Sequence, residues 1–202
     1  MDNLFNKVNK SERIKKFVNF DTEKPFHVYI DMDGVLTNFQ QSFMGIKVNK
    51  NRLTIEEYDK QNGKFSGWII VDGEGPTWWS HMPWMPDGKK LWNYFLKYDP
   101  CILSAPSRNP MSARGKIAWV NRELGLNVES ATSSSKGPKW PEDSRMILSA
   151  QKYMFAKRYP NSILIDDTPN KIGDWVGNGG IGILHTDTES TIKKFEEIIA
   201  NL

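Results

Sequence analysis

"HVYIDMDGVLTNF", residues 27–39, places two acids at the end of an apolar run and follows them at once with a glycine. The first four residues favour a buried strand, because β-branched and aromatic residues prefer extended backbone. Asp31 and Asp33 are poor strand residues, and Gly34 indicates a turn. On this stretch alone two interpretations stay open: a strand–turn–helix corner in which an aspartate caps the helix, or a functional site at the strand end.

The composition is that of an ordinary globular protein. The 202 residues, 39% of them hydrophobic, suffice for one good-sized core with a small inserted lobe. The net charge of +3 permits an anionic substrate but does not argue for binding to long nucleic acid, which usually accompanies a strong basic bias. The one cysteine, Cys101, excludes an internal disulfide and a zinc site of several cysteines, and it fits a reducing compartment.

Neither a membrane span nor a secretory signal is visible in the sequence. No apolar run approaches the roughly 20 residues that a membrane span needs. The N-terminal stretch carries scattered lysines without an apolar signal core. We therefore expect a cytoplasmic protein that does not bind membranes.

Strand and helix patterns alternate along most of the chain. Apolar runs predict strands at residues 26–31, 101–103, 146–148, 161–165 and 181–184, with a weaker candidate in "LNVES" at 126–130. Helical spacing follows at 35–46, at 85–98 with Asp87 as the expected cap, at 113–124 with Gly125 as the stop, and at 188–202. This alternation predicts an α/β fold with a Rossmann-like, doubly wound parallel sheet.

The expected division of the chain follows from where this alternation fails. Residues 25–46 and 86–202 form the predicted core. Residues 1–24 are predicted as a polar arm or helix, and residues 47–85, which lack a regular pattern, as a small inserted cap.

Polar residues follow four of the predicted strands. In a parallel, doubly wound sheet, ligands bind beyond the carboxyl ends of the strands. The residues at these ends are, in chain order, Asp31 and Asp33, Ser104, Ser149 and Lys152, and Asp166 and Asp167. Their convergence favours a functional site over a helix cap.

The chemistry of this set indicates phosphoryl transfer. Converging carboxylates repel one another, and a divalent metal such as Mg²⁺, which prefers oxygen ligands, relieves the repulsion. One carboxylate can then attack phosphorus to form an aspartyl-phosphate, while an acid two residues on protonates the leaving oxygen and later activates water. Ser104 and Lys152 supply the hydroxyl and the ammonium that a transferring phosphoryl group requires.

Four stretches, in order, resemble the motifs of the haloacid dehalogenase-like hydrolases: "DMDGVLTNF", "ILSAPS", "ILSAQK" and "ILIDD". The resemblance extends from about Phe26 to His185 and is closer to the 5′(3′)-deoxyribonucleotidase branch, because "GKIAWVNRELG" stands where that branch has a K-x-A-W-V helix. It implies the fold of that superfamily, with a small cap between the first two motifs. It also implies a Mg²⁺-dependent phosphatase of nucleoside or deoxynucleoside monophosphates.

The resemblance assigns a role to each matching residue. Asp31 is the expected nucleophile and a metal ligand, and Asp33 is the acid/base that also contacts the metal through its backbone carbonyl. Gly34 lets the turn close over the phosphate. The remaining assignments are Ser104, beside Ala105, for the transferring phosphate, Lys152 for neutralising nucleophile and phosphate, and Asp166 and Asp167 for Mg²⁺.

The chain departs from that branch at two positions. Ala105 replaces one hydroxyl of a T-S pair, and Thr168 stands where an arginine often follows the paired acids. These departures put nucleotide selectivity in doubt, but not dephosphorylation. Lys157 competes with Lys152 for the lysine role, and we favour Lys152 because Lys157 would lie mid-helix, away from the strand end.

Five of the eight tryptophans fall within one 25-residue window, residues 68–92. For any single one, the core of the inserted cap is the simpler expectation. The functional alternative is a stacking wall for a nucleobase, and for this we select Trp78 and Trp79, with Phe39 facing the same space. For Arg108 and Lys116, which follow the second motif, a solvated face is the simpler expectation and phosphate steering the alternative.

Several functional alternatives stay open. The first is a polynucleotide 3′-phosphatase, which would act on a nucleic-acid end. The second is a phosphatase of sugars or other small metabolites, and the third is a non-catalytic binding member of the same fold. A small cap often leaves a site open, so an oligomer or a larger substrate could complete it.

Overall fold

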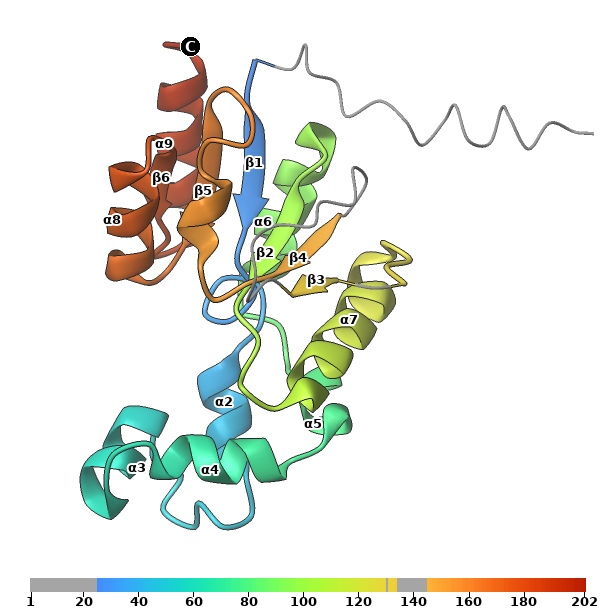
Figure 1. The fold of residues 1–202 in the computed structure, drawn as a ribbon, viewed down its shortest axis with the longest axis vertical. Coiled ribbons are helices and arrows are strands. Elements are labelled where there is room, and N and C mark those ends of the chain that lie inside the picture. Colours follow the sequence, from blue (N-terminus) through green and yellow to red (C-terminus); the bar gives the residue numbers. More distant parts are fainter. Residues whose placement is uncertain (1–24, 130, 134–144) are drawn as a thin grey trace, which may run out of the picture.

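The computed structural model describes residues 25–129, 131–133 and 145–202 (Figure 1). The polar arm predicted at residues 1–24 lies outside the described residues. In the part of the chain that the structure describes, no helix has the length and apolarity to cross a membrane.

A six-stranded sheet forms the centre of the fold, with the strand order β3-β4-β2-β1-β5-β6. The strands are β1 (His27–Ile30), β2 (Cys101–Ser104), β3 (Thr132–Ser133), β4 (Met146–Leu148), β5 (Ser162–Asp166) and β6 (Ile181–Leu184). All neighbouring strands pair in parallel. The chain places β2 on one side of β1 and later returns to place β5 on the other, so the switch of direction occurs at β1. The predicted doubly wound parallel sheet is confirmed.

Helices cover both faces of the sheet and extend beyond its carboxyl edge. They are α2 (Phe39–Met44), α3 (Ile55–Asn62), α4 (Ser66–Gly73), α5 (Pro76–Ser80), α6 (Gly88–Phe95), α7 (Pro110–Leu124), α8 (Pro169–Gly177) and α9 (Thr188–Ile199), with the short 3₁₀ helices η1 (Leu96–Tyr98) and η2 (Lys152–Phe155). The pattern at 113–124 correctly predicted most of α7, which ends where Gly125 adopts a left-handed conformation.

The alternation of side chains along β1 creates two apolar cores. Val28 and Ile30 belong to the larger core, which α6 and α9 cover. Tyr29 points to the other face and packs edge-on against Trp175 of α8, with ring centroids 5.3 Å apart. Burial on both faces explains why the strands are short, continuous apolar runs rather than alternating ones.

The segment at residues 47–85 is more regular than its sequence suggests. It forms α3, α4 and α5, and α3 begins with a capping box in which the Thr54 side chain and Glu57 each accept a backbone N–H of the other. The helices are short and joined by glycines, which hides their period. α3 and α4 lie beyond the carboxyl ends of the strands, whereas α5 packs against α7 (Figure 1).

Two local expectations are corrected by the structure, and one helix was missed. Residues 126–129 of "LNVES" form no strand, and the strand in that region is β3. Asp87 precedes α6 but makes no side-chain cap. Its carboxylate instead accepts from the backbone N–H of Thr188 (2.7 Å) and ties α6 to the start of α9. Helix α8 follows the second pair of acids, where no helix was expected.

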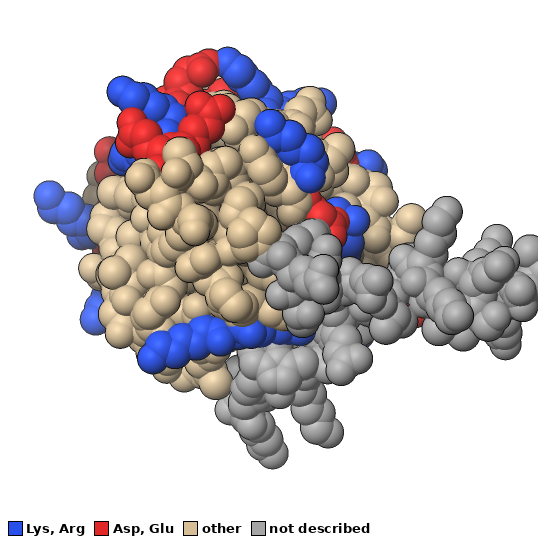
Figure 2. Space-filling model, turned by 90° about the horizontal axis from the view of Figure 1, so that it is seen from above, with Lys and Arg blue, Asp and Glu red and all other residues tan. Residues whose placement is uncertain are grey.

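Charged side chains are distributed rather than concentrated on the face shown in Figure 2. Among the described residues visible there, Lys and Arg lie at the margins of a broad uncharged area and partly beside acids. Among the described residues on this face, the basic side chains are therefore separated by an uncharged area and by acids, unlike the broad basic surface typical of proteins that bind long nucleic acids.

Candidate active site

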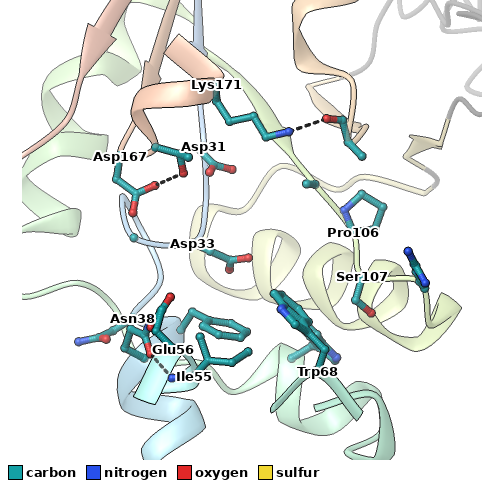
Figure 3. Close-up of a pocket in the computed structure, with 18 of the residues that line it drawn as sticks. Asp31, Asp33, Asn38, Ile55, Glu56, Trp68, Pro106, Ser107, Asp167 and Lys171 are labelled. Atoms are coloured by element: carbon teal, nitrogen blue, oxygen red, sulfur yellow. Dashed lines mark hydrogen bonds between the residues drawn. The ribbon is translucent and has the colours of Figure 1, made fainter. Parts of the chain in front are cut away.

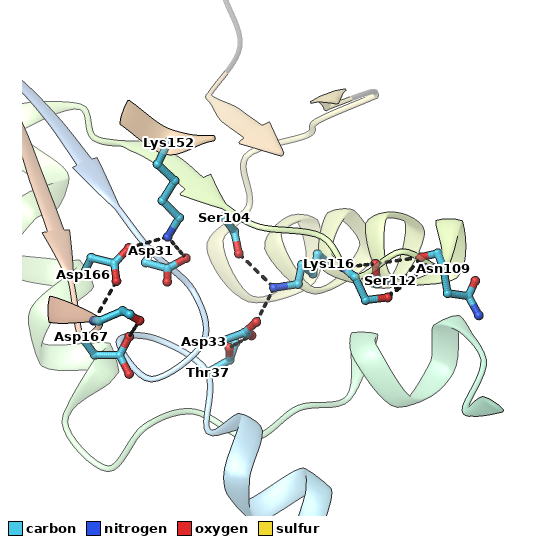
Figure 4. Close-up of polar contacts among 12 residues, drawn as sticks. Asp31, Asp33, Thr37, Ser104, Asn109, Ser112, Lys116, Lys152, Asp166 and Asp167 are labelled. Atoms are coloured by element: carbon cyan, nitrogen blue, oxygen red, sulfur yellow. Dashed lines mark hydrogen bonds and ion pairs between the residues drawn. The ribbon is translucent and has the colours of Figure 1, made fainter. Parts of the chain in front are cut away.

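Asp31 lies where β1 ends, in the middle of the carboxyl edge of the sheet. Its backbone N–H donates to the carbonyl of Ile165 (3.0 Å), which keeps the residue against β5. Asp31 is 7% exposed, and its Oδ1 lies 2.7 Å from Nζ of Lys152 (Figure 4). A carboxylate removed from water to this extent needs such a partner.

Lys152 is the cation shared by two of the acids. It begins η2, is 2% exposed, and places its Nζ 2.6 Å from Oδ2 of Asp166. Burial alone would lower the pKa of this lysine, but the carboxylates of Asp31 and Asp166 outweigh burial and leave the pKa raised. Lys152 is therefore charged at neutral pH. Lys157, the competing residue, is exposed beyond the end of η2.

Three carboxylates converge at this edge of the sheet. Oxygens of Asp31, Asp166 and Asp167 lie within 4.8 Å of one another. Burial, together with the charges of Asp31 and Asp166, raises the pKa of Asp167 to about 6. Burial and Asp31 also raise the pKa of Asp166, against the opposing effect of Lys152. One ammonium thus does not compensate all three acids, and this all-oxygen donor set fits a hard divalent cation.

Gly34 lets the backbone pass directly beside this acid cluster. Its φ of +82° is in the left-handed region, and a Cβ at this position would collide with the carboxylate of Asp167. The backbone N–H groups of residues 35–37 all donate to the carbonyl of Met32, which closes the turn. The glycine is thus required both by the turn and by the acid it faces.

Asp33 belongs to a second polar group, on the other side of the turn (Figure 4). Its Oδ1 accepts from the Thr37 hydroxyl (2.9 Å), and its Oδ2 lies 2.5 Å from Nζ of Lys116. The same Nζ donates to Oγ of Ser104 (2.9 Å). Both oxygens of Asp33 accept hydrogen bonds, as those of an ionised carboxylate do.

A cavity of about 950 Å³ opens beside both groups. Asp31, Asp33 and Asp167 lie at one end of it, and Ile55 and Trp68 lie at the other (Figure 3). The volume far exceeds that of a phosphate group, so a phosphate beside the acids would leave room for an organic group against the apolar wall. Of the remaining residues predicted to bind substrate, Gly34, Phe39, Trp79 and Ala105 line the cavity, whereas Ser104 and Trp78 do not.

The aromatic wall differs from the one suggested by the sequence. Trp68, on α4, is 38% exposed, lines the cavity and stacks against Phe39 with ring centroids 5.5 Å apart. Trp78 instead packs edge-on against Phe39 and Trp79, outside the cavity lining. Trp79 lines the cavity but is 2% exposed, because α5 turns it toward α7.

Comparison with known proteins identifies the family. No protein-family model matches the chain. A protein of Vibrio phage KVP40 named "Putative 5′(3′)-deoxyribonucleotidase" is 32% identical over 159 residues, which cover 77% of this chain and 74% of that protein. The chain belongs to this deoxyribonucleotidase family. It is thus a hydrolase. A solved hydrolase from Streptococcus pneumoniae TIGR4 aligns with 87% of this chain and 99% of its own, at 12% identity and a TM-score of 0.46.

Thr168, where the resemblance led us to expect an arginine, lies next to the acid cluster. Its backbone N–H donates to Oδ1 of Asp166 (2.9 Å), and its hydroxyl lies 3.3 Å from Oδ1 of Asp167. Lys171, one helical turn further on, lines the cavity and donates to the carbonyl of Ala150 (2.8 Å; Figure 3). Thr168 therefore orients the two acids, and Lys171 provides a cation on the cavity wall.

Two residues of the site were not identified from the sequence. The solvated face expected for Lys116 is wrong, because its side chain is 0% exposed and contacts Asp33 and Ser104. A signal was present in the sequence: the apolar Trp119 and Val120, three and four residues after Lys116, indicate the same face of the helix, and the structure buries both. Trp68 carried no comparable signal, because α4 was not recognised as a helix.

The cluster makes a prediction about Asp167. Replacing it by asparagine removes a carboxylate whose ionisation is unfavourable, so we expect Asp167→Asn to unfold at a higher temperature than wild type in EDTA at neutral pH. Mg²⁺ at 100 times its Kd should stabilise the wild type by about 2.7 kcal/mol and the variant much less. Thermal unfolding with and without Mg²⁺ measures both effects. Asp174→Asn, at an exposed acid of α8, is the control and should respond to Mg²⁺ like wild type. An equal response of Asp167→Asn would show that the cluster does not bind the metal.

Proposed function

We propose that this protein is a Mg²⁺-dependent phosphomonoester hydrolase that acts on nucleoside or deoxynucleoside monophosphates through an aspartyl-phosphate. The observation that carries the proposal is the buried Asp31, which lies beside a charged lysine and two further acids at the head of a large, partly aromatic cavity. Membership of the deoxyribonucleotidase family supports it.

The acid cluster accounts for the metal in this proposal. Asp31, Asp166 and Asp167, together with the backbone carbonyl of Asp33, would hold Mg²⁺, whose charge offsets that of the cluster and of the substrate phosphate. Lys152 remains beside Asp31 and Asp166 and neutralises part of the same charge.

Asp31 and Asp33 carry the covalent chemistry. In the first step a carboxylate oxygen of Asp31 bonds to phosphorus, the ester P–O bond breaks, and the leaving oxygen takes a proton from Asp33. In the second step a water oxygen bonds to phosphorus, the bond to Asp31 breaks, and Asp33 takes the proton that the water loses.

Asp33 must hold a proton when the first step occurs. The Ser104 hydroxyl accepts from Lys116 and does not line the cavity, so in this proposal it acts behind the phosphate rather than on it. Gly34 and Ala105 border the transferring phosphate without side chains that would obstruct it.

The cavity wall supports a nucleoside rather than a bare sugar as the organic group. The ring of Trp68 stacks against Phe39 and is partly accessible, and Ile55 adds apolar surface nearby. Base–aromatic stacking contributes about 1–3 kcal/mol per base. In this proposal residues 47–85 are a cap whose helix α4 closes the cavity over the base.

The first test is phosphate release from a panel of substrates. We expect turnover of deoxynucleoside 5′- and 3′-monophosphates that requires Mg²⁺, stops in EDTA, and falls on the order of 10⁴-fold or more in Asp31→Asn. Ribonucleotides, a 3′-phosphorylated oligonucleotide and sugar phosphates complete the panel. A clear preference for either of the last two would replace the proposed substrate class. Absence of turnover with folded, Mg²⁺-loaded protein would contradict the proposal as a whole.

The second test concerns the aromatic wall. Trp68→Ala should raise KM for a deoxynucleotide by roughly 5- to 150-fold, the equivalent of about 1–3 kcal/mol, because a stacking surface is lost. KM for glycerol phosphate, which has no ring to stack, should change little. Trp78→Ala is the matched control on the next helix, since Trp78 contacts Phe39 without lining the cavity. Equal effects of Trp68→Ala on both substrates would exclude stacking.

A further inference from the structure

Lys116 is a lysine buried inside the protein without being part of the acid cluster. Its side chain is 0% exposed, at the middle of α7. Burial of an ammonium is unfavourable unless it is paired and hydrogen-bonded. Its partners are Oδ2 of Asp33 at 2.5 Å and Oγ of Ser104 at 2.9 Å, both of which belong to the proposed site.

The packing of α5 on α7 seals this lysine in place. Gly115 lies at the contact, and a Cβ there would come within 2.5 Å of the Pro76 carbonyl and also collide with Trp79. With glycine in place the two helices meet closely, and the ring centroid of Trp79 lies 5.4 Å from Nζ of Lys116. An ammonium over an aromatic face is attracted to the ring. The surroundings thus hold the lysine in one position.

The directions of the hydrogen bonds are fixed by chemistry. An ammonium only donates, so Ser104 Oγ and Asp33 Oδ2 must both be acceptors. Ser104 therefore orients the Lys116 ammonium by accepting one of its N–H groups. Lys116 in turn donates to Oδ2 of Asp33, and the Thr37 hydroxyl donates to Oδ1. Thr37 and Lys116 thus fix the carboxylate of Asp33 from both sides. Neither Lys116 nor Ser104 lines the cavity.

We propose that Lys116 is a positioning residue for Asp33, aligned by Ser104, and that it determines how effectively Asp33 protonates the leaving oxygen. This inference rests on the proposed function and adds a residue to it. Lys116 does not touch the substrate in this account, but acts through the orientation of Asp33. Loss of the lysine leaves Asp33 present but free to rotate away from the ester oxygen.

The dependence on the leaving group distinguishes this role from a merely structural one. A deoxynucleoside leaves as an alkoxide and needs a proton, whereas p-nitrophenolate is a stable anion and does not. We expect Lys116→Met to lower kcat/KM for a deoxynucleotide by on the order of 10²-fold, and for p-nitrophenyl phosphate by only a few-fold. Asp33→Asn should show the same contrast. Lys157→Met, at an exposed lysine, should leave both values unchanged.

A second variant keeps the test independent of folding. Ser104→Ala removes the hydroxyl that aligns Lys116, but the buried ammonium keeps its ion pair with Asp33. We expect this variant to lose more kcat/KM for the deoxynucleotide than for p-nitrophenyl phosphate, by a smaller factor than Lys116→Met. If the inference is right, adding Ser104→Ala to Lys116→Met should cost little more for the deoxynucleotide, because both act through Asp33.

The outcomes separate this inference from the proposed function. A wild-type protein that hydrolyses neither substrate overturns both. An active wild type, whose Lys116→Met or Ser104→Ala variant loses the same factor on both substrates, overturns the positioning role alone and leaves the phosphatase intact.

Discussion

The arrangement of the site depends on one buried ammonium among converging acids. Lys152 lies 2.7 Å from Asp31 and 2.6 Å from Asp166, at the point where the direction of the sheet reverses. Breaking such a buried pair by removing one partner typically costs about 3–5 kcal/mol, because the remaining charge is left without compensation. The positive charge of Lys152 makes the close approach of Asp31 and Asp166 feasible. The negative charge that remains on the three-acid cluster makes it suitable for binding a cation.

A second buried lysine, Lys116, contacts the other acid of the proposed chemistry, Asp33. Lys152 comes from η2 and contacts Asp31, whereas Lys116 comes from α7 and contacts Asp33. Asp31 and Asp33, the two acids with a proposed covalent or proton-transfer role, therefore contact different buried lysines from separate elements. Because Trp79 lies over Lys116 and also lines the cavity, the segment at residues 47–85 contributes to the orientation of Asp33 as well as to the substrate wall.

The sequence was sufficient for the sheet and for the acids, because continuous apolar runs ending in Asp or Ser determine both the strands and the edge where they converge. It was insufficient where a role depends on contacts between distant segments. Lys116 is buried only because Gly115 lets α7 approach α5, and the choice of Trp68 over Trp78 as the exposed ring depends on how α4 and α5 are turned. The spacing along α7 could have placed Lys116 on its inner face but not identified its partners, and the orientations of Trp68 and Trp78 do not follow from local patterns in a segment of short, glycine-linked helices.

The central claim is that Asp31 forms a bond to phosphorus, and a covalent intermediate tests it most directly. Asp33→Asn should slow the hydrolysis of the aspartyl-phosphate while p-nitrophenyl phosphate still reacts with Asp31. We expect a burst of one equivalent of p-nitrophenolate, and peptide mapping after an acid quench that finds one added phosphoryl group on Asp31. A wild type that turns over, together with an Asp33→Asn variant that shows neither the burst nor the modified Asp31, would contradict the account.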